Sequence, residues 1–175
     1  MILVGSVRRN GNTELLAKAF ADGAGKQNEV KVVSVADYRV YPCKGCNCCY
    51  TSEGNQCVQN DDMTEIYNLL AQADTLVIAS PVYFYGVGAQ LKALIDRLHT
   101  PMRNHFNIKH LGLILVGAAT IPDLFEPITM QYRMLLRFFG LKDIGTVLVS
   151  GAKEKGDILN GDGIKRAYER GFNLQ

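Results

Sequence analysis

The sequence predicts an α/β fold in which one parallel sheet of five strands lies between two layers of helices. Short apolar runs alternate along the chain with segments whose apolar residues recur at helical spacing. The runs at residues 75–79 and 111–117 are almost uniformly apolar, as parallel strands covered on both faces should be. The chain of 175 residues is long enough for one such domain and too short for two ordinary ones.

The strand order follows from the character of the apolar runs. The run at residues 29–36 alternates only in part and suits an edge strand, whereas the continuous runs suit the centre. Right-handed crossovers between parallel strands then favour the order 2-1-3-4-5. The five predicted strands are residues 1–4, 29–36, 75–79, 111–117 and 145–149.

Five helices are predicted between and after these strands. In the first, Leu16, Ala19, Phe20 and Gly23 recur at helical spacing. Asp61 and Asp62 stand just before another helix, where acidic residues favour a helix start. The predicted helices are residues 12–23, 63–70, 87–98, 128–139 and, more weakly, 164–171.

Charge and hydropathy limit the partners of the chain. The chain has 19 Lys and Arg residues and 17 Asp and Glu residues, and neither the positive nor the negative charges form a long block. The electrostatic pattern expected of a nucleic-acid binder is therefore missing. The apolar runs have strand length, and the first one begins at Met1 without a basic leader. We therefore expect a cytoplasmic protein with no nucleic-acid or membrane partner.

The residues from Gly5 to Thr13 connect an apolar strand to an amphipathic helix and predict an anion site. The N–H groups at a helix start lack intrahelical partners, and the helix dipole adds positive charge there. Ser6, Asn12 and Thr13 add short donors and Arg8 adds a cation, which suits a phosphate monoester. No dinucleotide fingerprint or triphosphate P-loop is present. The alternative is that Asn12 or Thr13 only caps the helix.

A second loop carries three consecutive rings, Tyr83, Phe84 and Tyr85, between a buried strand and a helix. Gly86 and Gly88 let the backbone approach a flat ligand, whose face the rings could cover. The alternative is that one or two of these rings simply cover the strand ends as core. In the order 2-1-3-4-5 both loops stand at the carboxyl ends of strands 1 and 3, where the direction of winding reverses. A phosphate at one loop and a planar heterocycle at the next indicate FMN.

Three stretches resemble the NAD(P)H-dependent FMN reductases of the flavodoxin-like superfamily: Gly5-Ser6-x-Arg8-x-x-Gly11-Asn12-Thr13, Ala79-Ser80-Pro81-Val82-Tyr83 and Leu91-Lys92-x-Leu94-Ile95-Asp96-Arg97. Val7 departs from the pattern, since many relatives carry proline there. The resemblance implies a flavodoxin-like three-layer sandwich, FMN as cofactor and NAD(P)H as electron donor. It also implies that the phosphate is held by Ser6, Arg8, Asn10, Asn12 and Thr13, that the isoalloxazine ring is bordered by Pro81, Val82, Tyr83, Phe84, Tyr85 and Gly86, and that Gly117 and Ala118 close the third side.

All five cysteines lie within residues 43–57, an odd number without a secretion signal, so a structural disulfide framework is not indicated. Cys43, Cys46, Cys49 and Cys57 offer four thiolates that suit a [4Fe-4S] cluster or a zinc ion. The pattern is similar to that of the iron-sulfur flavoproteins of the same superfamily, with Cys48 as a spare thiol. A loop that has lost its cluster, a zinc site and a reactive thiol pair are the alternatives.

Hydride transfer to a flavin needs proximity and an open ring face more than an acid or a base, so no catalytic residue is predicted. His99, His105 and His110 show no helical pairing and are interpreted as surface or capping residues. Arg97 and Arg103 are interpreted as solvated charges near a helix end, with contact to a nicotinamide cofactor's phosphates as the alternative.

The leading hypothesis is an FMN-dependent oxidoreductase that takes electrons from NAD(P)H and passes them to a small acceptor or to free flavin. The second is an iron-sulfur electron carrier between a partner protein and FMN, and the third is a flavin-free binding module that kept only the fold. The apolar faces of helices 87–98 and 128–139 exceed what one sheet needs. They predict a homo-oligomer, a dimer or tetramer, whose second subunit helps to cover the flavin.

Overall fold

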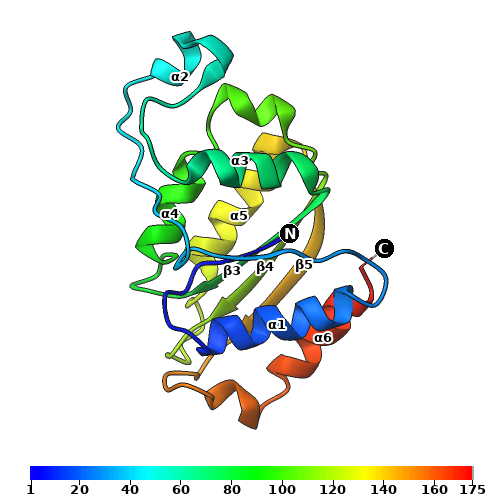
Figure 1. Cartoon of the computed structure of the whole chain (residues 1–175). Helices are drawn as coiled ribbons and strands as arrows, with labels where there is room; N and C mark the ends of the chain where they lie inside the picture. The colour runs from blue at the N-terminus through cyan, green and yellow to red at the C-terminus, as the bar shows by residue number, and fades with distance from the viewer. Residues whose placement is uncertain (175) are drawn as a thin grey trace.

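The computed structural model describes residues 1–174 and contains one parallel sheet with the strand order β2-β1-β3-β4-β5, as the sequence predicts. Every pair of neighbouring strands is parallel. The strands cross the middle of the molecule in Figure 1. Their bounds are β1 Ile2–Val4, β2 Val32–Ser34, β3 Thr75–Pro81, β4 His110–Val116 and β5 Lys142–Val149.

Helices cover both faces of this sheet and form a three-layer sandwich. Figure 1 shows α1 and α6 on one face and α3, α4 and α5 on the other. All five predicted helices are present, within a few residues of their predicted ends. Their bounds are α1 Asn12–Ala24, α3 Met63–Gln72, α4 Ala89–Asp96, α5 Glu126–Phe139 and α6 Gly163–Phe172. No helix within residues 1–174 has both the length and the apolar character needed to cross a membrane.

Four short helical segments were not predicted from the periodicity, because each is five residues or shorter and carries no amphipathic repeat. Two of them lie in the loop of about residues 41–60 that carries all five cysteines, which we call the cysteine loop, and one follows α4. Their bounds are α2 Cys48–Thr51, η1 Glu53–Asn55, η2 Pro101–His105 and η3 Asp157–Asn160.

The core is divided in two by the sheet, since alternate residues of a strand point to opposite faces. On β1, Ile2 and Val4 join the cluster beneath α1 and α6, whereas Leu3 joins the cluster beneath α3, α4 and α5. All three side chains are almost fully buried. This is why the central strands have a continuous apolar sequence.

The two edge strands differ from their predicted lengths. β2 pairs with β1 over only Val32–Ser34, and Val32 is 45% exposed because no strand covers the outer edge. β5 begins at Lys142, three residues before its predicted start, and its register with β4 shifts between Leu111 and Leu113. Gly145, with a positive φ of 90°, lies at this irregularity. Apolar patterning does not show where edge pairing ends, because pairing there needs little side-chain burial.

Helices α1 and α6 pack with their backbones in direct contact through two glycines. A Cβ on Gly171 would lie 2.1 Å from the carbonyl oxygen of Phe20, and a Cβ on Gly23 would lie 2.2 Å from that of Tyr168. Neither backbone oxygen can move without shifting its helix. Glycine therefore sets the distance between these two helices.

We predict that Gly171→Ala lowers the free energy of unfolding by about 1–3 kcal/mol, as overpacking does, although alanine is the better helix former. Gly161→Ala is the matched control, because no atom lies within 4 Å of its added Cβ. Urea unfolding followed by circular dichroism measures both variants. An unfolding midpoint for Gly171→Ala at or above that of the wild type would contradict the packing argument.

Candidate functional site

The two loops singled out in the sequence lie against each other at the carboxyl ends of β1 and β3. Gly5, which directly follows β1, donates its N–H to the carbonyl oxygen of Ala79 on β3 at 2.7 Å. A Cβ on Gly88 would lie only 2.8 Å from the carbonyl oxygen of Gly5. We call residues 5–13 the phosphate loop and residues 81–88 the ring loop. Their contact means that one ligand can touch both.

The phosphate loop leads to a helix start without a side-chain cap. The N-cap residue of α1 is Gly11, and neither Asn12 nor Thr13 caps the helix. This excludes the alternative in which these two residues serve only as caps. The first N–H groups of α1 are therefore free of side-chain acceptors, which is what an anion at a helix N-terminus requires.

The side chains of the phosphate loop have different partners. The Oγ of Ser6 accepts the N–H of Arg8 at 3.2 Å and shapes the turn. Arg9 forms an exposed ion pair with Asp37, whereas the guanidinium of Arg8 has no hydrogen bond or ion pair within residues 1–174. The backbone N–H of Asn10, which has a positive φ of 52°, donates to the carboxylate of Glu14. Arg8 is thus the charge that this loop leaves available to a ligand.

Asn12 is oriented toward another part of the chain. Its amide nitrogen donates to the carbonyl oxygen of Glu154 at 2.8 Å, and its amide oxygen accepts the N–H of Gly156 at 2.8 Å. The side chain therefore fixes the loop after β5 to the start of α1. We propose that Asn12 meets a phosphate through its backbone N–H, and that its side chain shapes the site through this loop.

The ring loop forms a tight turn that leaves its aromatic side chains in solvent. Tyr83 and Gly86 exchange two backbone hydrogen bonds, at 2.9 and 3.0 Å, around Phe84 and Tyr85. Both central residues have positive φ, 46° and 63°, which non-glycine residues adopt only at a cost. Tyr83 and Tyr85 are each 47% exposed and Phe84 is 97% exposed. These values exclude the interpretation of the three rings as core.

The third predicted border, Gly117 and Ala118, directly follows β4 at the same edge of the sheet. Gly117 donates its N–H to the carbonyl oxygen of Val149 at 2.9 Å and is buried, while Ala118 is exposed. A Cβ on Gly117 would lie 2.4 Å from the side chain of Leu124. The segment therefore extends the edge formed by the two loops, and Ala118 is its accessible residue.

A cavity of about 450 Å³ lies at the other end of the sheet, where β1 and β3 begin. Its lining includes Met1, Phe20, Lys31 and Asp74. Ligands of doubly wound sheets bind at the carboxyl ends of the strands, so we place the functional site at the two loops. There the rings of Tyr83, Phe84 and Tyr85 are exposed and accessible to a flat ligand.

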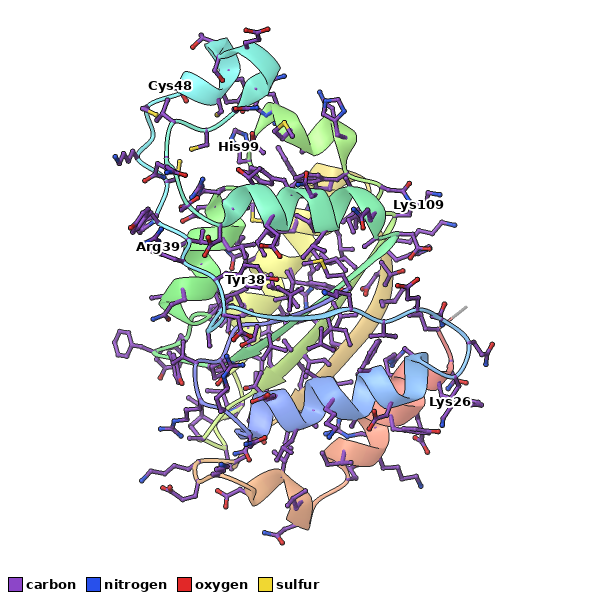
Figure 2. All side chains as sticks on the ribbon, viewed as in Figure 1. Lys26, Tyr38, Arg39, Cys48, His99 and Lys109 are labelled. Carbon is purple, nitrogen blue, oxygen red and sulfur yellow. The ribbon has the colours of Figure 1, made fainter. Side chains whose placement is uncertain are left out.

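The cysteine loop extends from the body of the protein at the end that holds α2, and Figure 2 labels Cys48 and His99 there. All five cysteines are free; Cys43 and Cys46 are exposed, and Cys48, Cys49 and Cys57 are half-buried. No three Cys, His, Asp or Glu side chains of the described chain are grouped closely enough to hold a metal ion. The thiols fit a metal cluster by donor type and number, but the loop does not present them as a formed site.

Two of these thiols influence each other. Two hydrogen bonds lower the pKa of Cys46, the larger effect coming from the backbone N–H of Cys48 and the smaller from its thiol. The positive charge of Lys44 lowers this pKa further. The interaction with Cys46 in turn raises the pKa of Cys48. Cys46 is therefore the thiol of this pair that ionises first.

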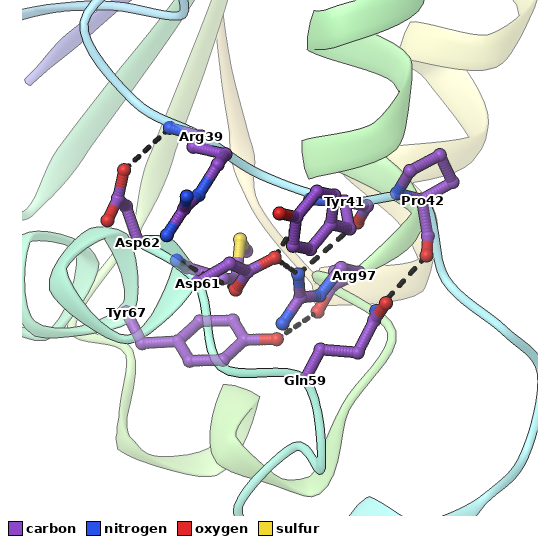
Figure 3. Close-up of polar contacts among 9 residues, drawn as sticks. Arg39, Tyr41, Pro42, Gln59, Asp61, Asp62, Tyr67 and Arg97 are labelled. Carbon is purple, nitrogen blue, oxygen red and sulfur yellow. Dashed lines mark hydrogen bonds and ion pairs between the residues drawn. The ribbon is translucent and has the colours of Figure 1, made fainter.

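A buried ion pair at the base of the cysteine loop was missed in the sequence. Asp61 and Arg97 form a salt bridge in which their side chains are only 1% and 3% exposed. Figure 3 shows this pair between the two arms of the loop, with Tyr67 donating its hydroxyl to the carbonyl oxygen of Arg97 at 2.7 Å. The interpretation of Arg97 as a solvated charge was therefore wrong, because the chain around α4 buries its guanidinium against Asp61.

The ionisation of this pair is set by opposing effects. Burial disfavours the carboxylate of Asp61, but hydrogen bonds from Arg97 and from the N–H groups of Tyr41 and Met63 outweigh it and lower the pKa of Asp61. Burial likewise opposes the charge of Arg97, yet Asp61 raises the pKa of Arg97. Both groups are charged at neutral pH.

His99, His110 and Arg103 have local partners, whereas His105 is exposed. The Nδ1 of His99 lies 3.4 Å from the hydroxyl of Tyr50, and that of His110 lies 3.4 Å from the hydroxyl of Thr75. Arg103 stacks over Phe138 at 5.5 Å from the ring centroid. Figure 2 shows His99 beside the cysteine loop and away from the phosphate loop and the ring loop.

Comparison with known proteins identifies the family of the chain. A family model described as NADPH-dependent FMN reductase matches residues 1–153. The chain belongs to this family. The matched residues include the phosphate loop, the cysteine loop, the ring loop and Gly117-Ala118, so every segment of the candidate site lies within the match.

Individual relatives agree with this assignment. An iron-sulfur flavoprotein of Methanocaldococcus jannaschii is 40% identical over 118 residues, which are 66% of this chain and 60% of that protein. An iron-sulfur flavoprotein of Archaeoglobus fulgidus is 30% identical over an aligned length of 179, covering 98% of this chain and 76% of that protein. The matched region thus spans about 60% of the first relative's length.

A solved structure shares the flavodoxin-like fold of this chain. The NAD(P)H:quinone oxidoreductase from Methanothermobacter marburgensis superposes with a TM-score of 0.79 over 99% of this chain and 94% of that one. At 21% identity this likeness concerns the fold alone.

Proposed function

We propose that the protein is an FMN-dependent oxidoreductase that takes electrons from NAD(P)H and passes them to a small acceptor or to free flavin. The observation that carries this proposal is the close approach of Gly5 and Gly88, which brings the phosphate loop against the ring loop. The phosphate loop leads to an uncapped helix start and leaves Arg8 unpaired, and the ring loop exposes three rings. Membership of the FMN reductase family supports the proposal. The phosphate loop suits a phosphate and the ring loop a planar heterocycle.

Each segment of the candidate site has its own part in this proposal. Bound FMN would supply the hydride acceptor. Ser6, Arg8, Asn10, Asn12 and Thr13 hold its phosphate, and residues 81–86 border the ring, with Gly117 and Ala118 on the third side. The protein would position the flavin for hydride transfer from the nicotinamide, which requires proximity and no acid or base from the chain.

The purified protein is expected to be yellow, to hold about one FMN per chain at saturation and to oxidise NAD(P)H when an acceptor is present. Absorbance spectra, calorimetric titration with FMN and the decrease in NAD(P)H absorbance measure these properties. Colourless protein that releases no heat on mixing with FMN would contradict the proposal and favour a flavin-free binding module.

A second proposal concerns the cysteine loop. The spacing of Cys43, Cys46, Cys49 and Cys57 and the iron-sulfur flavoproteins among the relatives support a [4Fe-4S] cluster that makes the protein an electron carrier. The exposed loop would have to close around it. Iron, zinc and sulfide analysis of anaerobically purified protein decides between a cluster, zinc and free thiols. A cytoplasmic location, which keeps thiols reduced, belongs to this proposal.

We further propose that the protein is a homo-oligomer built through α5. The apolar residues of α4, including Leu91, Leu94 and Ile95, are buried in the protein's own core, so α4 has no spare apolar face. On α5, Met130, Met134 and Phe138 are 51–58% exposed at a spacing of four residues. Light scattering coupled to size-exclusion chromatography is expected to show a dimer or tetramer, and a monomer at micromolar concentration would contradict this proposal.

A further inference from the structure

The cysteine loop is closed at its base by contacts between its two arms. We define the neck as residues 39–42 together with residues 59–62, and the head as residues 43–58, which contain all five cysteines. Arg39 and Asp62 are joined twice, through Asp62 N–H to Arg39 O at 3.0 Å and Arg39 N–H to Asp62 Oδ2 at 2.6 Å. The side chain of Gln59 donates to the carbonyl oxygen of Pro42 at 3.1 Å. The neck therefore holds both ends of the head together (Figure 3).

The buried pair of Asp61 and Arg97 ties this neck to α4. Asp61 Oδ2 accepts the N–H of Tyr41 at 2.8 Å, and Arg97 Nη1 donates to the carbonyl oxygen of Tyr41 at 3.2 Å. One side chain from the second arm and one from the end of α4 thus bind the N–H and the carbonyl group of the same residue of the first arm. None of these three residues is needed for the proposed contacts to FMN.

Helix α4 connects the pair of Asp61 and Arg97 to the ring loop. It begins at Ala89, directly after the ring loop, and ends at Asp96, directly before Arg97. An α-helix of this length extends over about 12 Å. Gly88, directly before the start of α4, lies against the carbonyl oxygen of Gly5. The same short helix therefore positions the ring loop at one end and the neck at the other.

The guanidinium of Arg97 also keeps one donor unused. The Nε–H of Arg97 is buried and has no hydrogen-bond acceptor within the described residues. A buried arginine with a spare donor is a costly feature if its role is only to fill the core.

We propose that Asp61 and Arg97 are positioning residues that hold the cysteine head at a fixed place relative to the flavin, through the neck and α4. The pair thereby fixes the position, relative to the flavin site, of any group that the thiols bind, and it does not contact the flavin itself. The part of this inference that concerns the flavin rests on the proposed function, whereas the role of the pair in the neck stands on the contacts described above.

The test compares holoprotein variants that differ at the pair. Asp61→Leu combined with Arg97→Met replaces the buried charges by apolar groups of similar size, a change that tends to preserve the fold. Arg97→Lys keeps the charge, and Lys92→Met is the matched control, because it removes an exposed ion pair with Asp96 on the same helix. Hydrogen exchange of residues 39–62, the FMN dissociation constant, and iron and sulfide bound after anaerobic reconstitution are measured for each protein.

In the double variant, the amides of Tyr41 and Met63 are expected to exchange about tenfold faster or more, because their shared acceptor Asp61 is gone. FMN affinity stays within about twofold, and the bound iron and sulfide fall to less than about half. Arg97→Lys recovers iron and sulfide binding in part, and Lys92→Met behaves as the wild type.

Two results would overturn the inference. The first is neck exchange in the double variant at the wild-type rate. The second is a loss of FMN affinity that parallels the loss of neck protection, which would show that the pair only supports the whole fold. Wild-type protein that binds no FMN would refute the proposed function and the link to the flavin, while hydrogen exchange would still decide the role of the pair in the neck.

Discussion

Replacing Arg8 with glutamate is expected to weaken FMN binding by about a hundredfold or more while leaving riboflavin binding nearly unchanged. A hydrogen bond between arginine and a phosphate is assisted by charge and contributes about 1.5–3 kcal/mol, or roughly 10- to 150-fold in affinity. Glutamate removes this bond and adds repulsion between like charges. Riboflavin lacks the phosphate, so its affinity depends on the ring loop and not on residue 8.

The neighbouring arginine provides the control for this prediction. Arg9 is engaged with Asp37 at the surface, so Arg9→Gln is expected to change FMN affinity by less than about threefold. Quenching of flavin fluorescence gives both dissociation constants, and repeating the titrations at higher salt should reduce the difference between the variants. Equal losses for Arg8 and Arg9, or an equal loss for FMN and riboflavin, would show that Arg8 does not meet the phosphate.

The fold could be predicted because its central strands are buried on both faces. Uniformly apolar runs such as 75–79 and 111–117 have few alternatives in a chain of this length, and the crossover rule then restricts their order. The two site loops could be located for a related reason, since each lies between a recognisable strand and helix. Edge pairing was less predictable, as β2 shows, because little apolar surface is buried there.

The missed features depend on contacts between residues far apart in the chain. Arg97 is 36 residues from Asp61, and the side chain of Asn12 is more than 140 residues from its partners Glu154 and Gly156. A polar residue shows no local pattern that distinguishes a buried partner from water. The one available signal was the position of Arg97 between Ile95 and Leu98, both of which are buried core residues.

Removing one partner of the buried pair should destabilise the protein strongly. Asp61→Leu alone and Arg97→Met alone are each expected to lower the free energy of unfolding by about 3–5 kcal/mol, because each leaves one buried charge uncompensated. The double variant is expected to lose much less than the sum of the single changes, since no charge remains to be solvated. Lys92→Met, at an exposed pair, should cost about 0.5 kcal/mol or less.

Acid separates this electrostatic effect from a simple packing defect. The pKa of Asp61 is lower in the folded protein than the value of about 3.9 that an unfolded chain has, so the pair stabilises the fold fully above about pH 5. This contribution disappears as the pH falls through the folded-state pKa of Asp61. Urea unfolding between pH 3 and 7 should therefore show a steeper loss of stability for the wild type than for the double variant. Parallel pH profiles would mean that Asp61 contributes through its volume and hydrogen bonds, and not through its charge.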